Sequence, residues 1–147
     1  MQNILSFKTK FGWISASENN NKILSVFFGK SKNRGKSILL HRLKKNLKKY
    51  FAKKTKTINL KILLDGSNLQ IKIWKELKKI PYGKTKSYGE IAKKVKTSPR
   101  YVGNVCGQNK HLLVVPCHRV IRTDGSLGGF SGSGGLTLKK RLLNLES

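Results

Sequence analysis

A cysteine, a histidine and an arginine stand side by side in an apolar stretch, LLVVPCHRVI, at residues 112–121. A free cysteine is ordinarily a small buried hydrophobe. Beside Cys117, however, the cation of Arg119 and the base of His118 would favour the thiolate, which is the nucleophilic form. Because neighbouring side chains diverge along a regular backbone, we expect a water to bridge Cys117 and His118. Glu146 is a candidate carboxylate to hold the imidazole in one tautomer.

The apolar run before Cys117 predicts a buried strand that stops at Pro116, because proline cannot donate to a sheet ladder. The thiol would then lie where regular structure ends. Four possible zinc ligands lie within residues 106–118, but the sequence has no C-x-x-C pair, so we expect no metal site. We interpret Cys106 as a core or pocket-lining residue rather than a second nucleophile.

The composition is strongly basic, with 32 Lys and Arg against 6 Asp and Glu and a formal net charge of +26. A charge of this size on a small protein attracts polyanions, and nucleic acid is the commonest large one in cells. A solvated lysine surface that reflects compositional bias accounts for many of these residues. The scarcity of carboxylates disfavours a two-metal nuclease site.

Two cysteines cannot build a disulfide framework, which favours a reducing, cytoplasmic location. The apolar content of 37% suffices for a core, whereas the longest apolar runs are far too short to cross a bilayer. The first residues show no secretory signal. We expect a monomer with no membrane partner.

The first half of the chain predicts a small sheet and a basic helix. Two β-prone segments, residues 11–17 and 23–28, flank an Asn-rich turn and predict a hairpin. Apolar residues at helical spacing predict a helix over residues 37–51, and residues 58–64 predict a further strand. We interpret the basic run RLKKNLKKYFAKK as the solvated face of this helix, with a DNA patch or a nuclear-targeting signal as alternatives.

The second half predicts three short helices with clear start signals. The first spans residues 69–80 and ends at a Pro-Tyr-Gly stop. Ser87 and Glu90 form a capping box for the second helix, and Ser98 followed by proline begins the third. Two helices joined by a tight turn in a basic protein suggest a helix-turn-helix, although an ordinary αα-hairpin is commoner.

One face of the third helix is slim, with Arg100, Gly103, Asn104 and Gly107 at helical spacing. Each glycine in a helix interior costs roughly 1 kcal/mol relative to alanine. Two of them a turn apart indicate that something bulky approaches closely. Another helix is one explanation, and the DNA minor groove, about 6 Å wide, is the other.

The segment VVPCHRVI resembles the active-site segment of the O6-alkylguanine-DNA alkyltransferases. Four further features occur in the family's order and at nearly its spacing. They are IPYGKTKSYGEIA (80–92) and Asn109 before this segment, and GSLGGFSG (125–132) and KKRLLNLE (139–146) after it. The resemblance covers the whole C-terminal half, whereas the N-terminal half is similar only as a small sheet domain.

The expected fold is α+β with two domains, residues 1–65 and 66–147, divided at the Asp-Gly-Ser-Asn break that begins at Asp65. The resemblance implies that the first is a sheet-and-helix domain of ribonuclease H-like topology. It implies that the second is a helical, helix-turn-helix domain that carries the active site.

The resemblance also implies direct repair of alkylated DNA without a cofactor. The protein would bind double-stranded DNA that contains O6-alkylguanine, enter the minor groove, rotate the damaged base out of the stack and transfer its alkyl group irreversibly to Cys117. Whether O4-alkylthymine also reacts is left open.

The implied site residues fall into three groups. The catalytic group comprises Cys117 as acceptor, His118 as base through water, Glu146 as its partner, Asn109 as a brace of the backbone and Tyr88, which contacts the flipped base. The implied substrate contacts are Ser131, Phe130, where tyrosine is frequent, and the Val120 carbonyl. The implied DNA contacts are Arg100, which fills the gap left by the base, with Ser98, Tyr101, Gly103 and Asn104.

Two other functions compete with this interpretation. A non-enzymatic helix-turn-helix sensor of alkylated DNA would lack the acceptor cysteine, so the presence of Cys117 favours the enzyme. A cysteine hydrolase is disfavoured, because hydrolases bring their base from a distant part of the sequence. The Gly-rich loop at residues 129–135 is expected to form a wall of the pocket.

Overall fold

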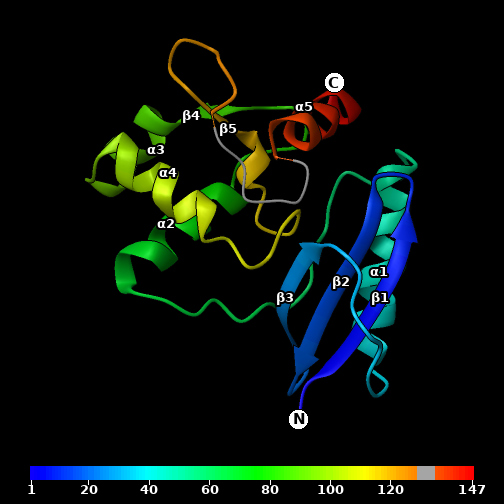
Figure 1. Ribbon diagram of the computed structural model, residues 1–147. Helices are drawn as coiled ribbons and strands as arrows, with labels where there is room; N and C mark the ends of the chain where they lie inside the picture. Colours follow the sequence, from blue (N-terminus) through cyan, green and yellow to red (C-terminus); the bar gives the residue numbers. More distant parts are fainter. Residues whose placement is uncertain (129–134) are drawn as a thin grey trace. The chain divides into compact units, whose positions relative to one another are not determined.

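The computed structural model describes every residue except 129–134, and the chain divides into two compact units. The first unit comprises Met1–Leu64 with Lys110–Val114, and the second comprises Asp65–Asn109 with Val115–Ser147. The architecture is mixed α+β, as predicted (Figure 1). The division into domains at residues 1–65 and 66–147 stays a prediction.

The first unit is built on an antiparallel sheet in the order β1-β2-β3. The predicted hairpin is confirmed, because β2 and β3 pair directly and the turn between them places Asn20 and Asn21 at φ 51° and 61°, as a tight hairpin turn requires. Strand β1 has no counterpart among the strands predicted from the sequence. The strands span Asn3–Thr9 (β1), Gly12–Asn19 (β2) and Lys22–Phe28 (β3).

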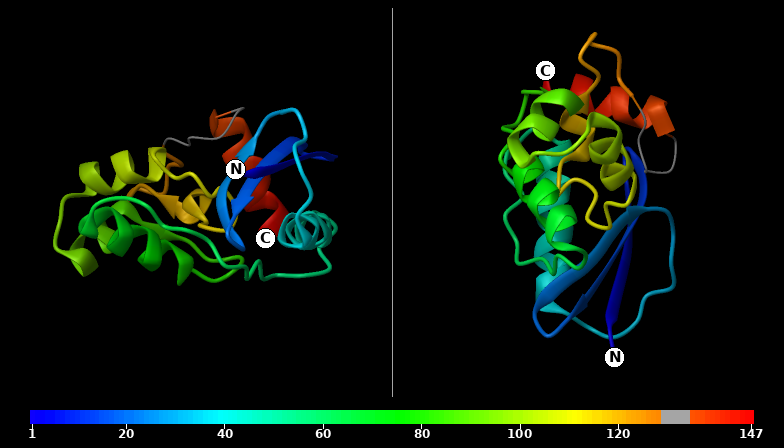
Figure 2. Two further views of the ribbon diagram at one scale, coloured as in Figure 1. Left: turned by 90° about the horizontal axis from the view of Figure 1, so that it is seen from below. Right: turned by 90° about the vertical axis from the view of Figure 1, so that its left-hand side faces the viewer.

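Helix α1 (Ile38–Phe51) packs against this sheet, along one face of it (Figures 1 and 2). The hydroxyl of Ser37 accepts the backbone N–H of Leu40, so the helix begins where the sequence predicts. Its apolar stripe is buried and closes the core of the unit. The buried residues of α1 are Leu39, Leu40, Leu43, Leu47, Tyr50 and Phe51.

Two predicted strands are wrong. Within residues 58–64 there is only one isolated bridge, in which Ile62 pairs with β3. The apolar run 112–115 makes a turn with Leu113 at φ 73°, which no strand residue adopts. Both runs are apolar, but a short apolar run shows only that a segment is suited to burial and leaves its backbone conformation open.

The second unit contains three helices that pack on one another. The predicted N-caps are confirmed, since the hydroxyls of Ser87 and Ser98 each accept the N–H three residues ahead. Lys96, at φ 60°, ends the second of these helices, and only three residues separate it from the third. The helices span Asn68–Lys78 (α2), Tyr88–Val95 (α3) and Pro99–Gly107 (α4).

The remaining elements of the second unit converge on Cys117. A single 3₁₀ turn, η1 (Cys117–Arg119), leads into β5 (Val120–Ile121), which pairs in parallel with β4 (Lys86–Ser87). Helix α5 (Gly135–Glu146) contacts η1, and this places the last turn of α5 beside the thiol-bearing segment. In the part of the chain that the structure describes, no helix is both long and apolar enough to cross a membrane.

Candidate active site

Two hydrogen bonds to the Val115 carbonyl hold the backbone that carries Cys117. The Cys117 N–H donates to the Val115 carbonyl at 2.8 Å, and the side-chain amide of Asn109 donates to the same carbonyl, also at 2.8 Å. Asn109 lies just beyond the end of α4, so this contact ties the turn to that helix. The Cys117 side chain is 2% exposed.

His118 and Glu146 meet although they lie 28 residues apart in the sequence. Nε2 of His118 lies 2.8 Å from Oε2 of Glu146, and both side chains are buried. A carboxylate accepts hydrogen bonds, so Nε2 carries the ring proton and Nδ1 presents a lone pair. That Nδ1 atom is buried and has no hydrogen-bond partner among the described residues.

Glu146 is held in turn by Arg119. The guanidinium donates from Nε to Oε1 at 2.9 Å and from Nη2 to Oε2 at 2.8 Å, and from Nη1 to the Ile80 carbonyl at 2.8 Å. The sequence presents Arg119 as a cation for the neighbouring thiol. In the structure the Arg119 guanidinium instead forms a bidentate ion pair with the buried Glu146 carboxylate, and this pair fixes the carboxyl plane.

The imidazole is a neutral base at neutral pH. Burial lowers the pKa of His118 below its usual 6.5, and the hydrogen bond and charge of Glu146 oppose this only in part. The nearby cations of Arg119 and Lys139 lower the pKa further. A buried neutral imidazole with a free lone pair can accept a proton from a thiol through one water.

Tyr88 and Lys139 form a second pair of groups near Cys117. The charge of a Cys117 thiolate would raise the pKa of both. Nζ of Lys139 donates to the Val120 carbonyl at 2.6 Å and to the Tyr88 hydroxyl at 3.3 Å. Burial raises the pKa of Tyr88 to about 12, so its phenol keeps its proton, and burial lowers the pKa of Lys139. A carbonyl has two lone pairs, which leaves Val120 able to accept from a substrate amine as well.

Lys139 is not among the site residues predicted from the sequence, although the sequence carries a signal for it. Lys139 is fully buried and shares the inner face of α5 with Leu142 and Glu146, at i, i+3 and i+7. A lysine is almost never fully buried without a partner. A lysine at helical spacing with the buried residues of a helix is therefore expected to be functional or to have a buried partner.

Cys106, on the buried side of α4, is the second thiol of this unit. Burial raises its pKa to about 12, so it stays protonated and unreactive at neutral pH. This agrees with its interpretation as a core or pocket-lining residue.

The slim face of α4 is open in the described structure. A Cβ atom built at Gly107 would meet nothing within 4 Å, and one at Gly103 would meet only the Tyr88 ring at 4.0 Å. Arg100 and Asn104 on the same face are exposed. No described helix therefore fills this face, so packing against another helix does not explain its glycines in the part of the chain that the structure describes.

Two predicted substrate contacts, Phe130 and Ser131, lie outside the described residues, with most of the Gly-rich loop. Val120, by contrast, lies directly after η1 and is buried. Ser98 caps α4, and Tyr101 lies in the first turn of the same helix.

A buried cysteine that precedes a histidine tied to a glutamate is an arrangement that could generate a cysteine nucleophile. Residues 68–147 match the family model described as "6-O-methylguanine DNA methyltransferase, DNA binding domain". The chain belongs to this methyltransferase family.

Curated relatives agree with the family model. The methylated-DNA–protein-cysteine methyltransferase of Methanosarcina acetivorans is 41% identical over 104 residues, 69% of this chain and 65% of that protein. The protein of the same name from Sulfolobus acidocaldarius is 45% identical over 97 residues, 66% of this chain and 61% of that one. The matched stretch thus spans a little under two thirds of these relatives.

Solved structures are similar over nearly the whole chain. The Mycobacterium tuberculosis OGT in complex with DNA is 30% identical, with a TM-score of 0.87 over 97% of this chain and 91% of that one. The O6-methylguanine methyltransferase from the same organism is 29% identical, with a TM-score of 0.81 over 99% and 93%. Residues 1–64, which the family model does not cover, therefore also have a counterpart in these structures.

Proposed function

We propose that this protein removes the alkyl group from O6-alkylguanine in duplex DNA and retains it on the sulfur of Cys117. One observation carries the proposal: Cys117 directly precedes a buried His118 that is tied to Glu146 through Nε2 and leaves Nδ1 without a partner among the described residues. The names of the relatives support the same reaction, and one solved relative holds DNA.

The first step makes the thiolate. The proton of the Cys117 thiol passes through a bridging water to Nδ1 of His118, which becomes an imidazolium. Glu146 stabilises that cation across the 2.8 Å contact at Nε2. Arg119 acts as a positioning residue, because it holds the carboxylate in place without touching the thiol or the substrate.

The second step is an in-line displacement at the alkyl carbon. The sulfur–carbon bond forms as the carbon–O6 bond breaks, and the electron pair moves into the guanine ring. The Tyr88 phenol gives its proton to the ring, and the ammonium of Lys139, 3.3 Å from the phenol oxygen, stabilises the phenolate that is left. The products are unmodified guanine and a thioether, which is a poor leaving group, so each chain reacts once.

The damaged base must leave the duplex before it can react. We infer that α3 and α4 act as a helix-turn-helix that enters the minor groove with its slim face. Arg100 fills the gap left by the flipped base, and Gly103 and Asn104 allow close approach. Ser98 and Tyr101 complete the DNA contacts. The ribonuclease H-like topology of the N-terminal unit, the monomeric state and the cytoplasmic location stay predictions.

Mass spectrometry tests this proposal directly. After the protein is mixed with a duplex that contains O6-methylguanine, we expect the chain to gain the mass of one methyl group on the peptide that contains Cys117. The peptide that contains Cys106 should be unchanged, because burial keeps that thiol protonated. Tight binding of the damaged duplex without any gain in mass would favour the non-enzymatic sensor.

Gly128→Ala is expected to slow methyl transfer by tenfold or more. Gly128 has φ +69°, and a Cβ atom there would lie 2.8 Å from both the hydroxyl and Cε2 of Tyr88, so the phenol must move. A misplaced proton donor reduces catalysis steeply. Single-turnover rates on damaged duplex measure the effect.

Gly125→Ala is the matched control for this substitution. Gly125 has φ +88°, but a Cβ atom there would meet nothing within 4 Å. Both variants bear a similar backbone strain, of about 1–2 kcal/mol. Equal rates for the two variants would mean that contact with Tyr88 is unimportant.

A further inference from the structure

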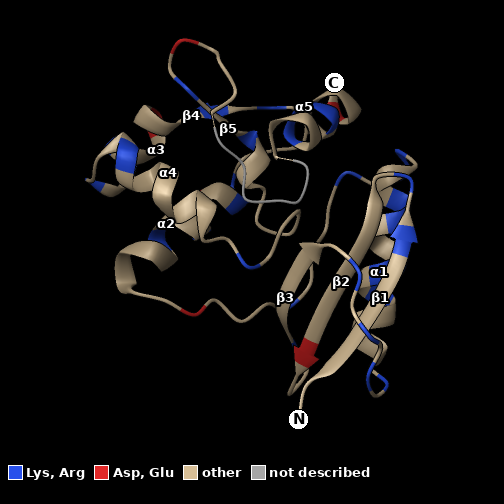
Figure 3. Ribbon diagram, viewed as in Figure 1, with Lys and Arg blue, Asp and Glu red and all other residues tan. Residues whose placement is uncertain are grey.

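The unit that lies mostly outside the DNA-binding family model is the more basic of the two. Residues 1–64 and 110–114 hold 17 Lys and Arg and a single acid, Glu18, whereas the second unit holds 15 Lys and Arg and five acids. Glu18 is buried and accepts hydrogen bonds from the Asn3 side chain and the Asn21 N–H. The first unit, which the structure describes throughout, therefore has many Lys and Arg positions and no exposed carboxylate (Figure 3).

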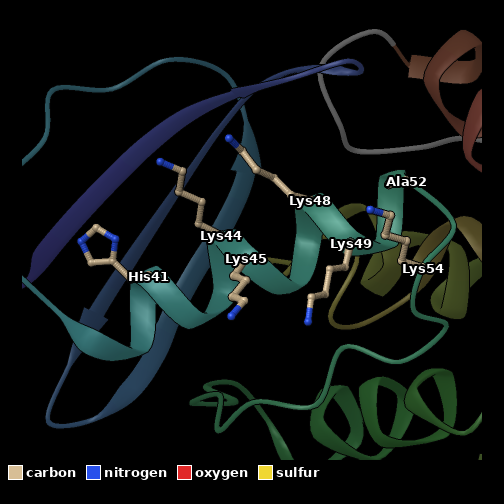
Figure 4. A pocket seen from close by; sticks show the side chains of 7 residues that line it. All are labelled: His41, Lys44, Lys45, Lys48, Lys49, Ala52 and Lys54. Atoms are coloured by element: carbon tan, nitrogen blue, oxygen red, sulfur yellow. The ribbon is translucent and has the colours of Figure 1, made fainter.

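The lysines of α1 form the densest part of this surface. Lys44 and Lys48 extend to one side of the helix axis, and Lys45 and Lys49 extend to the other, so the ammonium groups form two rows (Figure 4). Together they border an open hollow of about 410 Å³, whose lining is completed by His41, Ala52 and Lys54. We call this set of residues the α1 surface.

A second hollow, of about 270 Å³, extends the α1 surface. It shares Lys48 and Ala52 with the first hollow and adds Lys8 and Lys10 from the first hairpin of the sheet. The positive surface therefore continues from the helix onto the strand turn. Cations that continue from a helix onto a hairpin match an extended polyanion better than a single small anion.

The arrangement is unfavourable for the helix itself. Lys44 and Lys48, and likewise Lys45 and Lys49, are like charges at i, i+4, a spacing that destabilises a helix. Helix α1 contains no acidic residue that could relieve this repulsion. A merely solvated face normally mixes both signs of charge.

A hollow of equal size in the second unit provides a comparison. It is also about 410 Å³ and is lined by lysines of α2 and α3, but it includes Glu76, which pairs with Lys79 at 2.8 Å. Compositional bias toward lysine acts on both surfaces. Of these two hollows, the one on the α1 surface has no carboxylate among its described lining residues.

We propose that the α1 surface binds the phosphate backbone of duplex DNA, as a contact in addition to the one made by α4. Lysine binds phosphate as a point charge and reads no base. The contact is therefore independent of sequence and of damage, and it raises the affinity for DNA at large. It goes beyond alkyl transfer, because it needs neither Cys117 nor a flipped base.

A membrane surface fits the α1 surface less well. Binding in the plane of a bilayer uses large apolar residues beside the basic ones. The main hollow offers only Ala52 as an apolar lining residue, and Phe51 in the second hollow is 3% exposed. Duplex DNA, which presents one phosphate charge per about 1.7 Å of its axis, is the better match.

Replacing Lys44, Lys45, Lys48 and Lys49 with glutamine tests the proposal. Affinity for an undamaged duplex of about 30 base pairs is measured from about 50 to 300 mM salt, where each lost phosphate contact reduces the slope of log K against log salt by about 0.9. We expect the slope to fall by about 2–4 and the affinity at about 100 mM salt to fall at least tenfold. Glutamine is as good a helix former as lysine, so the fold should be retained.

The matched control removes four charges from the same unit outside the two hollows. Lys22, Lys32, Lys36 and Lys61 are exposed and line neither hollow. Their replacement with glutamine should change the slope by less than about 1, because residues outside the two hollows would not contact a phosphate bound there. Equal losses in the two variants would show that only net charge matters and would overturn the proposal.

Two further results would also overturn it. One is an unchanged slope in the α1 variant, and the other is loss of binding to phosphatidylserine vesicles while DNA binding stays intact. At saturating damaged duplex the α1 variant should still gain one methyl on Cys117. Its failure to do so would count against the proposed reaction and not against the phosphate contact, so the two proposals can fail separately.

Discussion

A Cys117→Ala variant is expected to lose methyl transfer completely while it binds damaged duplex almost as tightly as the parent. The sulfur is the atom that forms the new bond, and no other reactive thiol replaces it, because burial raises the pKa of Cys106 to about 12. The DNA contacts that we propose lie on α4 and α1, away from the thiol in the sequence. Mass spectrometry of the reacted protein and fluorescence anisotropy with labelled duplex measure the two properties.

Cys106→Ala is the control for this substitution. It also removes a buried sulfur, from a residue 6% exposed, and should cost a similar, modest amount of stability, yet it should retain one methyl per chain. If Cys117→Ala also lost its affinity for DNA, the thiol would have to be a structural element of the DNA-binding surface. Methyl transfer by the Cys117→Ala variant would remove Cys117 as the acceptor.

The helices of the second unit could be predicted from the sequence because their signals are local. Ser87 and Ser98 each cap a helix through a hydrogen bond to a residue three positions ahead. Such a contact depends on a few adjacent residues only. The same holds for the hairpin turn at Asn20 and Asn21.

Strands were predicted wrongly over residues 58–64 and 112–115, because a strand exists only if a partner continues beside it. Ile62 finds a partner in β3 for one residue, and Leu113 turns the chain with a positive φ. An apolar run carries no information about the length of its partner. The sequence therefore indicated burial correctly and backbone conformation wrongly.

The site divides in the same way. Cys117, His118 and Glu146 could be singled out because their side chains bear chemistry in any fold. The ion pair of Arg119 with Glu146 could not, because it joins residues 27 apart and depends on how α5 packs against η1. Lys139 reaches Val120 by the same packing.

Arg119→Ala is expected to reduce the free energy of unfolding by about 3–5 kcal/mol near neutral pH, because it leaves a buried charge without its partner. Two hydrogen bonds to Glu146 and one to the Ile80 carbonyl are lost together. The carboxylate, in a residue 4% exposed, then keeps its contact with His118 but loses the guanidinium charge. Chemical denaturation measures the loss, and Arg122→Ala, at an exposed arginine, should change stability by no more than about 0.5 kcal/mol.

The pH dependence of that loss separates an electrostatic role from simple packing. In the parent the pKa of His118 is below 6.5, so the unfolded chain binds more protons and His118 contributes stability that is lost as the pH falls below 6.5. Arg119 is one cause of that low pKa, so its removal raises the pKa of His118 and lets the imidazolium pair with Glu146. The variant should therefore lose less stability, relative to the parent, at about pH 6 than at about pH 8. Equal losses at the two pH values would mean that His118 takes up no proton when the arginine is absent, and Arg119 would then act only through packing.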